Sequence, residues 1–348
     1  MKKNLHIKFI PAILFAFVLT ISSCIEDNIT PPLTGDLNPV GEMLYYFESN
    51  GDFANSTGAP ALIQAEEVFS NLDNFLLIDI RPESEFKNGH IEHAFNVAYD
   101  SLYDFVEMNF HSNYPKIVLI SKNGHSSSYF SCMLRLAGFD NVYTLEYGMA
   151  SWNVDFAAEW LSELGDYNGI DKFTDSTFSK NDFTSLPQIS FANPNDQIDK
   201  RIKSRIKEII DYGFNQNEEY FLTLPGLLGI YPVCYGKTNL YNARKFGVFD
   251  EMGHPHNTRS YKDYPNYDLR TVNYLQTLPV TQPIFLYDYD GQLGACMTAY
   301  LRVLGYDVKM LLFGANQLFY SRLLDDPELI NYAFSTNNIQ NFPYVTGE

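Results

Sequence analysis

The sequence predicts an α/β protein in which one structural unit occurs twice. A compact apolar run, a glycine-bearing loop and an amphipathic helix follow each other from KIVLI onward and again from PIFLY onward. Short apolar runs followed by turn-forming residues are typical of buried strands. The spacing from the loop glycine to the glycine after the helix is the same in both, Gly124 to Gly138 and Gly291 to Gly305. This repetition predicts a duplicated α/β domain.

Composition supports a folded chain of two domains. The 348 residues are 45% hydrophobic and 19% charged, which fits globular domains with full cores. The formal net charge is -18. Because such an acidic chain repels phosphates, we expect neither nucleic acid nor an anionic membrane face as a partner.

The N-terminal residues predict export and a lipid anchor. Three lysines precede the apolar run FIPAILFAFVLTI, which is too short to span a bilayer and ends in ISSC. With Cys24 in that place, the segment resembles the lipobox of bacterial lipoproteins. The resemblance implies a signal peptide over 1–23, removed before a lipidated, palmitate-carrying Cys24; the alternative is a plain secretory signal. The acidic pair Glu26–Asp27 resembles an outer-membrane sorting signal, so we expect a lipid-anchored protein of the cell envelope.

The remaining elements follow in chain order. Residues 24–57 read as a proline-rich tether with a leading helix over Glu42–Ser49. Helix faces after the two loops are formed by Phe130, Met133, Leu134 and Ala137, and by Met297, Tyr300, Leu301 and Leu304. Gly138 and Gly305 stand where each helix would be capped. The polar stretch 163–195 reads as a linker, and its Asp175-Ser176-Thr177 resembles a bacterial O-glycosylation sequence.

A glycine loop between a strand and a helix is a device for holding anions. Successive backbone N–H groups turn inward, and the helix N-terminus adds partial positive charge. An enzyme that attacks sulfur or phosphorus through such a loop places a thiol at its start, because the same field lowers the thiol pKa.

The residues around the first loop resemble the rhodanese-like domain. IDIRPESEFKNGHIEHAFNVAY and KIVLISKNGHSSSYFSCMLRLAGFDNVYTLEYGMASW carry its signatures, among them Asp79, Arg81, His90, Gly148 and Trp152. The resemblance implies two such domains, over 58–162 and, in divergent form, 196–335, each an open, mainly parallel five-stranded sheet flanked by helices. Residues 336–348 would be a C-terminal tail. The segment GHPHNTRSY in the second repeat is interpreted as a diverged copy of the Gly-His-Ile segment in the first repeat.

The family's active loop reads Cys-x-x-Gly-x-Arg. In this sequence the two positions hold Ser121 and Ser126 in the first loop, and Asp288 and Leu293 in the second. Related phosphatases need an arginine one step later, where Ser127 and Gly294 stand. The resemblance therefore implies that both loops lack the nucleophile and its cation, and we expect no sulfurtransferase or phosphatase chemistry by that route.

Three functions stay open. The favoured one is a non-catalytic module that binds a small anion or an envelope protein, with no cofactor. Its anion-binding loop would be Ser121, Lys122, Asn123, Gly124, His125, Ser126 and Ser127, and its second loop Asp288, Tyr289, Asp290, Gly291, Gln292 and Leu293. The alternatives are a sulfurtransferase using a displaced thiol and an architectural role in an envelope assembly.

The cysteines and histidines are the remaining candidates for chemistry. Cys132, Cys234 and Cys296 form an odd set without a Cys-x-x-Cys pair, so we expect no disulfide framework. Cys132 or Cys296 would be the displaced thiol, and the other interpretation is two buried, structural cysteines. His254 and His256 with Asp288 and Asp290 have residue types that bind metals, but we expect no metal site because nothing places the two pairs together.

Overall fold

The computed structural model describes residues 38–347 except 111–113, 167–172, 215–229 and 243–252. The predicted signal peptide, Cys24 and most of the tether lie outside the described residues. Those described all belong to one compact unit, which contains two parallel sheets and a two-stranded antiparallel pair. None of the described helices combines the length and apolar character needed to cross a bilayer.

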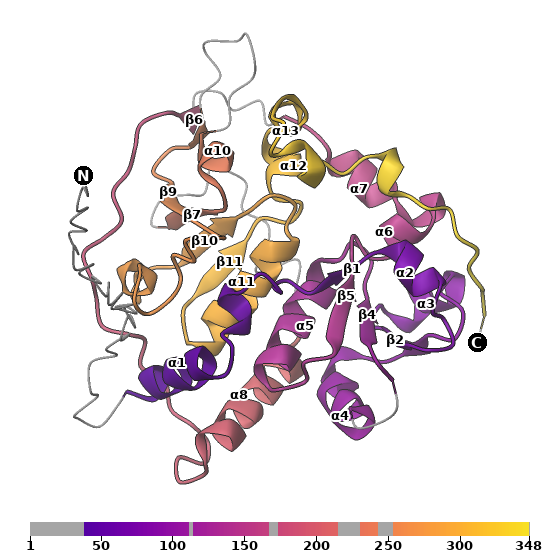
Figure 1. Ribbon diagram of the computed structural model, residues 1–348, viewed down its shortest axis with the longest axis horizontal. Coiled ribbons are helices and arrows are strands. Elements are labelled where there is room, and N and C mark those ends of the chain that lie inside the picture. The colour runs from indigo at the N-terminus through magenta and orange to yellow at the C-terminus, as the bar shows by residue number, and fades with distance from the viewer. Residues whose placement is uncertain (1–37, 111–113, 167–172, 215–229, 243–252, 348) are drawn as a thin grey trace, which may run out of the picture. The chain divides into compact units, whose positions relative to one another are not determined.

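The first sheet has five parallel strands in the order β1-β5-β4-β2-β3 (Figure 1). Its strands are β1 (Leu62–Ile63), β2 (Leu76–Asp79), β3 (Phe95–Asn96), β4 (Ile117–Ile120) and β5 (Val142–Leu145). The helices of this half are α2 (Ala65–Phe69), α3 (Glu83–Asn88), α4 (Tyr99–Asn109), α5 (His125–Leu136), α6 (Met149–Trp152) and α7 (Ala158–Glu163). This architecture confirms the predicted open parallel sheet.

The second sheet has four parallel strands in the described part of the chain, in the order β11-β10-β7-β9, where five were predicted. They are β7 (Tyr231–Tyr235), β9 (Arg259–Tyr261), β10 (Ile284–Tyr287) and β11 (Val308–Met310). The helices here are α8 (Ile198–Tyr212), α10 (Thr238–Tyr241), α11 (Gln292–Val303), α12 (Ala315–Leu318) and α13 (Tyr320–Asp325). Within the predicted linker, β6 (Phe173–Thr174) pairs antiparallel with β8 (His254–Pro255).

Short 3-10 helices complete the described chain. They are η1 (Phe53–Asn55), η2 (Val154–Phe156), η5 (Leu275–Thr277), η6 (Ile330–Tyr332) and η7 (Thr336–Asn338).

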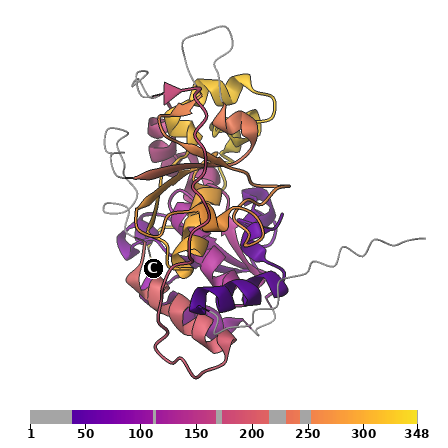
Figure 2. The same cartoon turned by 90° about the vertical axis from the view of Figure 1, so that its left-hand side faces the viewer.

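The helix predicted at Glu42–Ser49 is α1, which begins earlier, at Pro39. Asn38 explains the difference, because its side-chain oxygen accepts a hydrogen bond from the Val40 N–H at 2.7 Å and Pro39 suits the first helical position. α1 lies against α8, and both cross the lower part of Figures 1 and 2 (indigo and pink).

Helices α5 and α11 form the centre of the molecule. They lie side by side between the two sheets and share one hydrophobic core cluster (Figure 1). Both end as predicted: Gly138 and Gly305 adopt φ values of +99° and +94°. Because L side chains rarely adopt this conformation, glycine suits both positions.

The C-terminal residues 339–347 form a strap along the first half of the chain. The backbone N–H groups of Gln340 and Phe342 donate to the carbonyls of Ser151 and Trp152, both at 2.9 Å. Further along, Val345 exchanges two backbone hydrogen bonds with His90. Near the other end of the described chain, Phe47 and Asp52 contact the second half, on Tyr300 and Arg270. Each end of the described chain therefore lies on the half to which it does not belong in sequence.

Candidate functional site

The first candidate loop, Ser121–Gly124, leaves the carboxyl end of β4 and enters α5. All four residues of β4 are buried, which places the loop at the edge where the parallel strands end. Gly124 caps the helix with a φ of +85°. A Cβ on Gly124 would come within 2.5 Å of the Gln292 side-chain oxygen, so the close approach of the second half also requires glycine.

Hydroxyl groups fill the interior of this loop. The Ser121 Oγ accepts a hydrogen bond from the Gly124 N–H at 3.0 Å and lies 2.9 Å from the Ser127 Oγ. Ser127 donates its proton to the Gly124 carbonyl at 3.1 Å. The Ser121 hydroxyl therefore donates to Ser127, and no base lies in line to accept its proton.

His125 points away from Ser121, into the second half. Its Nε2 lies 3.1 Å from the carbonyl oxygen of Asp290, and its ring packs edge-on against Phe313. Burial lowers the pKa of His125 to about 4, so the imidazole is neutral near pH 7. In this geometry His125 is not placed to serve Ser121 as a base.

The other residues of the first loop divide into a buried and an exposed group. Asn123 is 2% exposed, and its carbonyl accepts the Trp160 indole N–H at 3.1 Å. Lys122 is about half exposed, and its ammonium lies 2.5 Å from the Glu159 carboxylate. Ser126 is partly exposed. Lys122 and Ser126 thus form the solvent-facing part of the loop.

The second candidate loop, Asp288–Gly291, joins β10 to α11 in the same way. Here aspartate side chains accept hydrogen bonds from the backbone amides of the loop. Asp288 accepts from the N–H groups of Gly291 and Gly294 at 2.8 and 2.9 Å. Asp290 accepts from the backbone and side-chain N–H groups of Gln292. Burial and then the neighbouring Asp290 raise the pKa of Asp288 to about 8, and burial raises that of Asp290 to about 6.

The two loops contact each other through matching hydrogen bonds. In each half a glycine follows the last strand, and the residue just before this glycine offers its backbone N–H. The side chain of the first residue of the other half's helix contacts that N–H. The Gln292 Oε1 accepts from the Tyr147 N–H at 2.8 Å, and the His125 Nε2 lies 3.4 Å from the Phe313 nitrogen. Behind them the Ser128 hydroxyl donates to the Gln292 carbonyl at 2.7 Å.

Further positions match between the halves. His90 stacks on Phe86 and its Nδ1 lies 2.9 Å from the Phe86 carbonyl; His254 stacks on Tyr241 and its Nδ1 lies 3.0 Å from the Tyr241 carbonyl. The register places Asp79 beside Ile120 in one sheet and Cys234 beside Tyr287 in the other. The Asp79 position of the first half is therefore occupied by Cys234 in the second.

Two hollows open next to the loops. The groove beside the first loop has a volume of about 1060 Å³ and contains Lys122 and Ser126 with Arg81, Tyr99 and Phe130 among its lining. Arg81 is held there by Asp79 at 2.6 Å and by the Gly89 carbonyl. The cavity beside the second loop has about 320 Å³ and includes Tyr289, Asp290 and Leu293.

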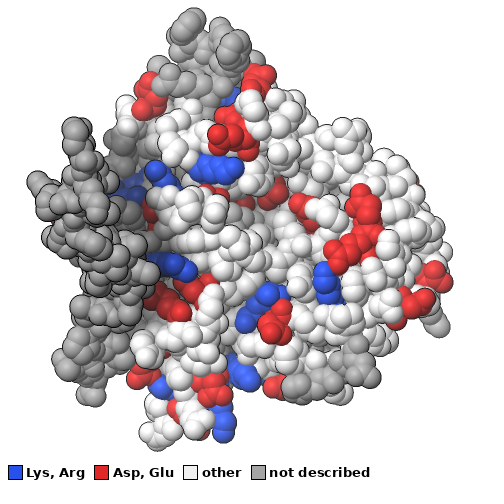
Figure 3. Space-filling view, in the orientation of Figure 1, with Lys and Arg blue, Asp and Glu red and all other residues white. Residues whose placement is uncertain are grey.

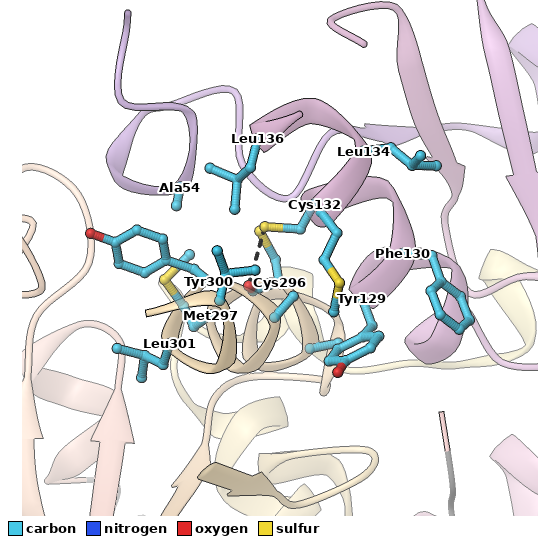
Figure 4. Packing of buried hydrophobic residues seen from close by; sticks show 14 of the residues in the cluster. Ala54, Tyr129, Phe130, Cys132, Leu134, Leu136, Cys296, Met297, Tyr300 and Leu301 are labelled. Atoms are coloured by element: carbon cyan, nitrogen blue, oxygen red, sulfur yellow. Dashed lines mark hydrogen bonds between the residues drawn. The ribbon is translucent and has the colours of Figure 1, made fainter. Parts of the chain in front are cut away.

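Cys132 and Cys296 lie away from both loops. Cys132 and Cys296 are buried on facing sides of α5 and α11, where the Cys132 sulfur lies 3.2 Å from the Cys296 carbonyl oxygen, among Leu136, Met297 and Leu301 (Figure 4). Burial raises the thiol pKa of Cys234 and of Cys296. An enclosed thiol with a raised pKa, such as that of Cys296, is a poor nucleophile, which weighs against its use as a displaced catalytic thiol.

The residues considered for a metal do not gather. His254 is bound by the Tyr241 and Ser176 carbonyls, and Asp288 and Asp290 are bound by their own loop. Across the described ranges, no group of three or more His, Cys, Asp or Glu side chains is placed to hold a metal ion.

Sequence reasoning missed the carboxylates Glu146 and Asp263, which line the cavity beside the second loop. Glu146 follows β5 directly, and Asp263 follows β9 by two residues. An acidic residue just past a parallel strand was the available signal, because such positions meet at the edge where ligands bind.

Comparisons with known proteins agree with this geometry. The model of the Rhodanese-like domain matches residues 64–155. The thiosulfate sulfurtransferase GlpE of Shewanella oneidensis is 34% identical over 80 residues, covering 22% of this chain and 74% of that protein. GlpE of Ectopseudomonas mendocina is 32% identical over 97 residues, covering 28% and 84%. The chain belongs to the rhodanese-like family.

One solved structure is also similar to the rhodanese-like chain. A thiosulfate sulfurtransferase from Pseudomonas aeruginosa is 12% identical to it, with coverage of 89% of this chain and 70% of that one and a TM-score of 0.25.

Proposed function

We propose that this rhodanese-like protein binds a small anion at its first loop and does not transfer sulfur. The observation that carries the proposal is the state of Ser121, whose hydroxyl is bonded inside the loop while the described thiols are buried elsewhere. Serine cannot form a persulfide, and this one has no base to activate it.

The first loop nevertheless keeps features that favour an anion. Within the described residues, loop side chains accept one hydrogen bond from its own amides, whereas those of the second loop accept three. Its α5 helix has twelve residues, so its N-terminal amides carry appreciable partial positive charge. Lys122 stands at the groove beside them.

We further propose that residues 196–335 are a second, divergent rhodanese-like domain. The matching cap glycines, the two stacked histidines and the reciprocal contacts of His125 and Gln292 support a common origin of the halves. In this view the carboxyl group of Asp288 occupies the loop amides that an external anion would otherwise bind.

The experiment is a thiosulfate:cyanide sulfurtransferase assay on the full chain purified in mild detergent. We expect no turnover by the wild type and measurable turnover by a Ser121→Cys/Ser126→Arg variant, which restores the family's loop. The Ser126→Arg single variant is the control without a thiol. Wild-type turnover that disappears in a Cys132→Ala/Cys296→Ala variant would contradict the proposal.

Anion binding is tested separately by calorimetric titration with thiosulfate, sulfate and phosphate. We expect binding that weakens about fivefold to tenfold in Lys122→Gln, because a charged hydrogen bond is lost. The matched control is Lys87→Gln, a lysine of the same groove that pairs with Glu83. No heat of binding for any of the three anions would contradict an anion site.

We also propose that the protein is anchored in the cell envelope by lipid on Cys24. The support is the ISSC segment after the apolar run. Growth with labelled palmitate should label the wild type and not a Cys24→Ala variant; equal labelling of both would contradict the anchor.

A further inference from the structure

The cavity beside the second loop differs in chemistry from the groove beside the first. Its lining includes three carboxylates from three separate segments, Glu146, Asp263 and Asp290. Across the described residues its lining contains neither lysine nor arginine. Such an arrangement attracts positive charge and repels anions.

Tyrosine rings make up much of the remaining wall. Tyr235, Tyr264, Tyr267, Tyr289 and Tyr332 all line the cavity. The faces of aromatic rings attract cations, and rings from this set already do so within the protein. The Arg270 guanidinium lies 5.0 Å from the Tyr267 ring centre, and the Lys237 ammonium lies 5.9 Å from that of Tyr332.

One polar atom in this wall lacks a partner. One oxygen of Asp263 is buried without a hydrogen bond in the described part of the chain, while the other accepts from the Tyr289 hydroxyl at 2.7 Å. A buried polar group left unpaired costs about 1–3 kcal/mol, so a ligand that donates to Asp263 would recover part of that cost.

We infer that this cavity binds a small organic cation, an amine or quaternary ammonium compound. A volume of about 320 Å³ suits a small molecule. A metal ion fits less well, because the described carboxylates do not converge into a group able to coordinate one. The inference concerns the second loop and stands apart from anion binding at the first.

The charge state of the wall supports the same ligand. Burial and then Asp290 raise the pKa of Glu146 to about 7, and Gln64 and Glu66 are its other neighbours. Burial also raises the pKa of Asp263, which faces Tyr289, Lys237 and Asp268. A bound cation would favour the ionised carboxylates, so its affinity should increase from pH 6 to pH 8.

The test is a titration of the full chain with choline, with phenethylammonium and with 3,3-dimethylbutan-1-ol, the neutral analogue of choline. We expect choline or phenethylammonium to bind at least about tenfold more tightly than the neutral alcohol. Glu146→Gln and Asp263→Asn should each weaken the cation about fivefold to tenfold. Glu83→Gln, an exposed acid at the other groove, should leave it within about twofold.

Two variants keep the test informative if one fails to fold, since Glu146 is bonded to Gln64 and Asp263 to Tyr289. Equal affinity of the wild type for choline and its neutral analogue would overturn the inference. So would the absence of binding by both cations at millimolar concentration, or binding that neither folded variant weakens.

Discussion

The two loops have the same backbone geometry but different side chains in their interiors. In both, a left-handed glycine starts a twelve-residue helix that packs against its counterpart. The first loop is lined by serine hydroxyls beside a groove that contains Lys122, whereas the second binds its own amides with Asp288 and borders an acidic, tyrosine-lined cavity. The comparison teaches that one turn geometry can be kept while its interior changes from hydroxyl groups to a carboxyl group.

The face of the molecule in Figure 3 shows no such division, since acidic and basic side chains are interspersed there among larger uncharged areas. The contrast described above lies at the two loops, and substitutions there are the way to examine it.

The largest effect on stability is expected from a substitution at a glycine that packs directly against the first loop. Gly148 has a φ of +59°, and a Cβ there would lie 2.2 Å from the Ser121 carbonyl oxygen. Gly148→Ala should therefore reduce the free energy of unfolding by more than about 4 kcal/mol, measured by denaturant titration. Gly138→Ala, with a φ of +99° but open space, is the control and should cost about 1 kcal/mol. Equal costs would contradict the close packing.

A middle effect is expected from the carboxylate in the second loop. Asp288→Ala leaves two buried amide N–H groups without acceptors, so it should cost about 2–4 kcal/mol of unfolding free energy at pH 5. The corresponding change in the first loop, Ser121→Ala, is the comparison. A smaller loss for Asp288→Ala than for Ser121→Ala would show that the carboxylate does not hold the loop.

The loops should also affect the pH dependence of stability in opposite directions. The folded pKa of Asp288, about 8, lies above that of an unfolded aspartate, so the folded state binds more protons and stability falls as pH rises from about 4 to 8. The folded pKa of His125, about 4, lies below its unfolded value, so its contribution rises between pH 4 and 6.5.

Two variants separate these contributions in thermal unfolding across pH 4–8. Asp288→Asn should flatten the loss of stability toward pH 8, and His125→Gln, which places the residue of the second loop in the first, should reduce the loss below pH 6.5. Profiles unchanged by both variants would mean that neither group titrates on folding.

The smallest effect is expected from the first loop itself. Ser121→Ala removes the acceptor of the Gly124 N–H and should cost about 1 kcal/mol, since one neutral hydrogen bond is lost. A loss of 3 kcal/mol or more in unfolding free energy would show that the hydroxyl network stabilises the first loop as strongly as Asp288 stabilises the second.

The fold could be predicted wherever local pattern determines it. The apolar runs gave β4 and β10, and the paired glycines gave the ends of α5 and α11. The second sheet has four strands in its described part, where five were predicted, because the prediction carried the first half's strand number over to a sequence that has diverged from it. Pairing across the halves, such as His125 with the Asp290 carbonyl, left no local signal because the partners are far apart in sequence.

The candidate site was predicted in part. The loop residues were located, but the hydrogen bonds of Asp288 to the Gly291 and Gly294 N–H groups were not foreseen. The cavity depends on Glu146 and Asp263, which come from different sheets and meet only in the folded chain. No spacing rule connects such residues.

The C-terminal strap has a consequence for the order of assembly. His90 and Lys87 obtain backbone partners from Val345 and Gly347, and the Trp152 indole N–H donates to the Pro343 carbonyl at 2.8 Å. The first half therefore remains short of these bonds until the strap has been synthesised. Although it comes first along the chain, this half depends on residues from the far end of the chain for these hydrogen bonds.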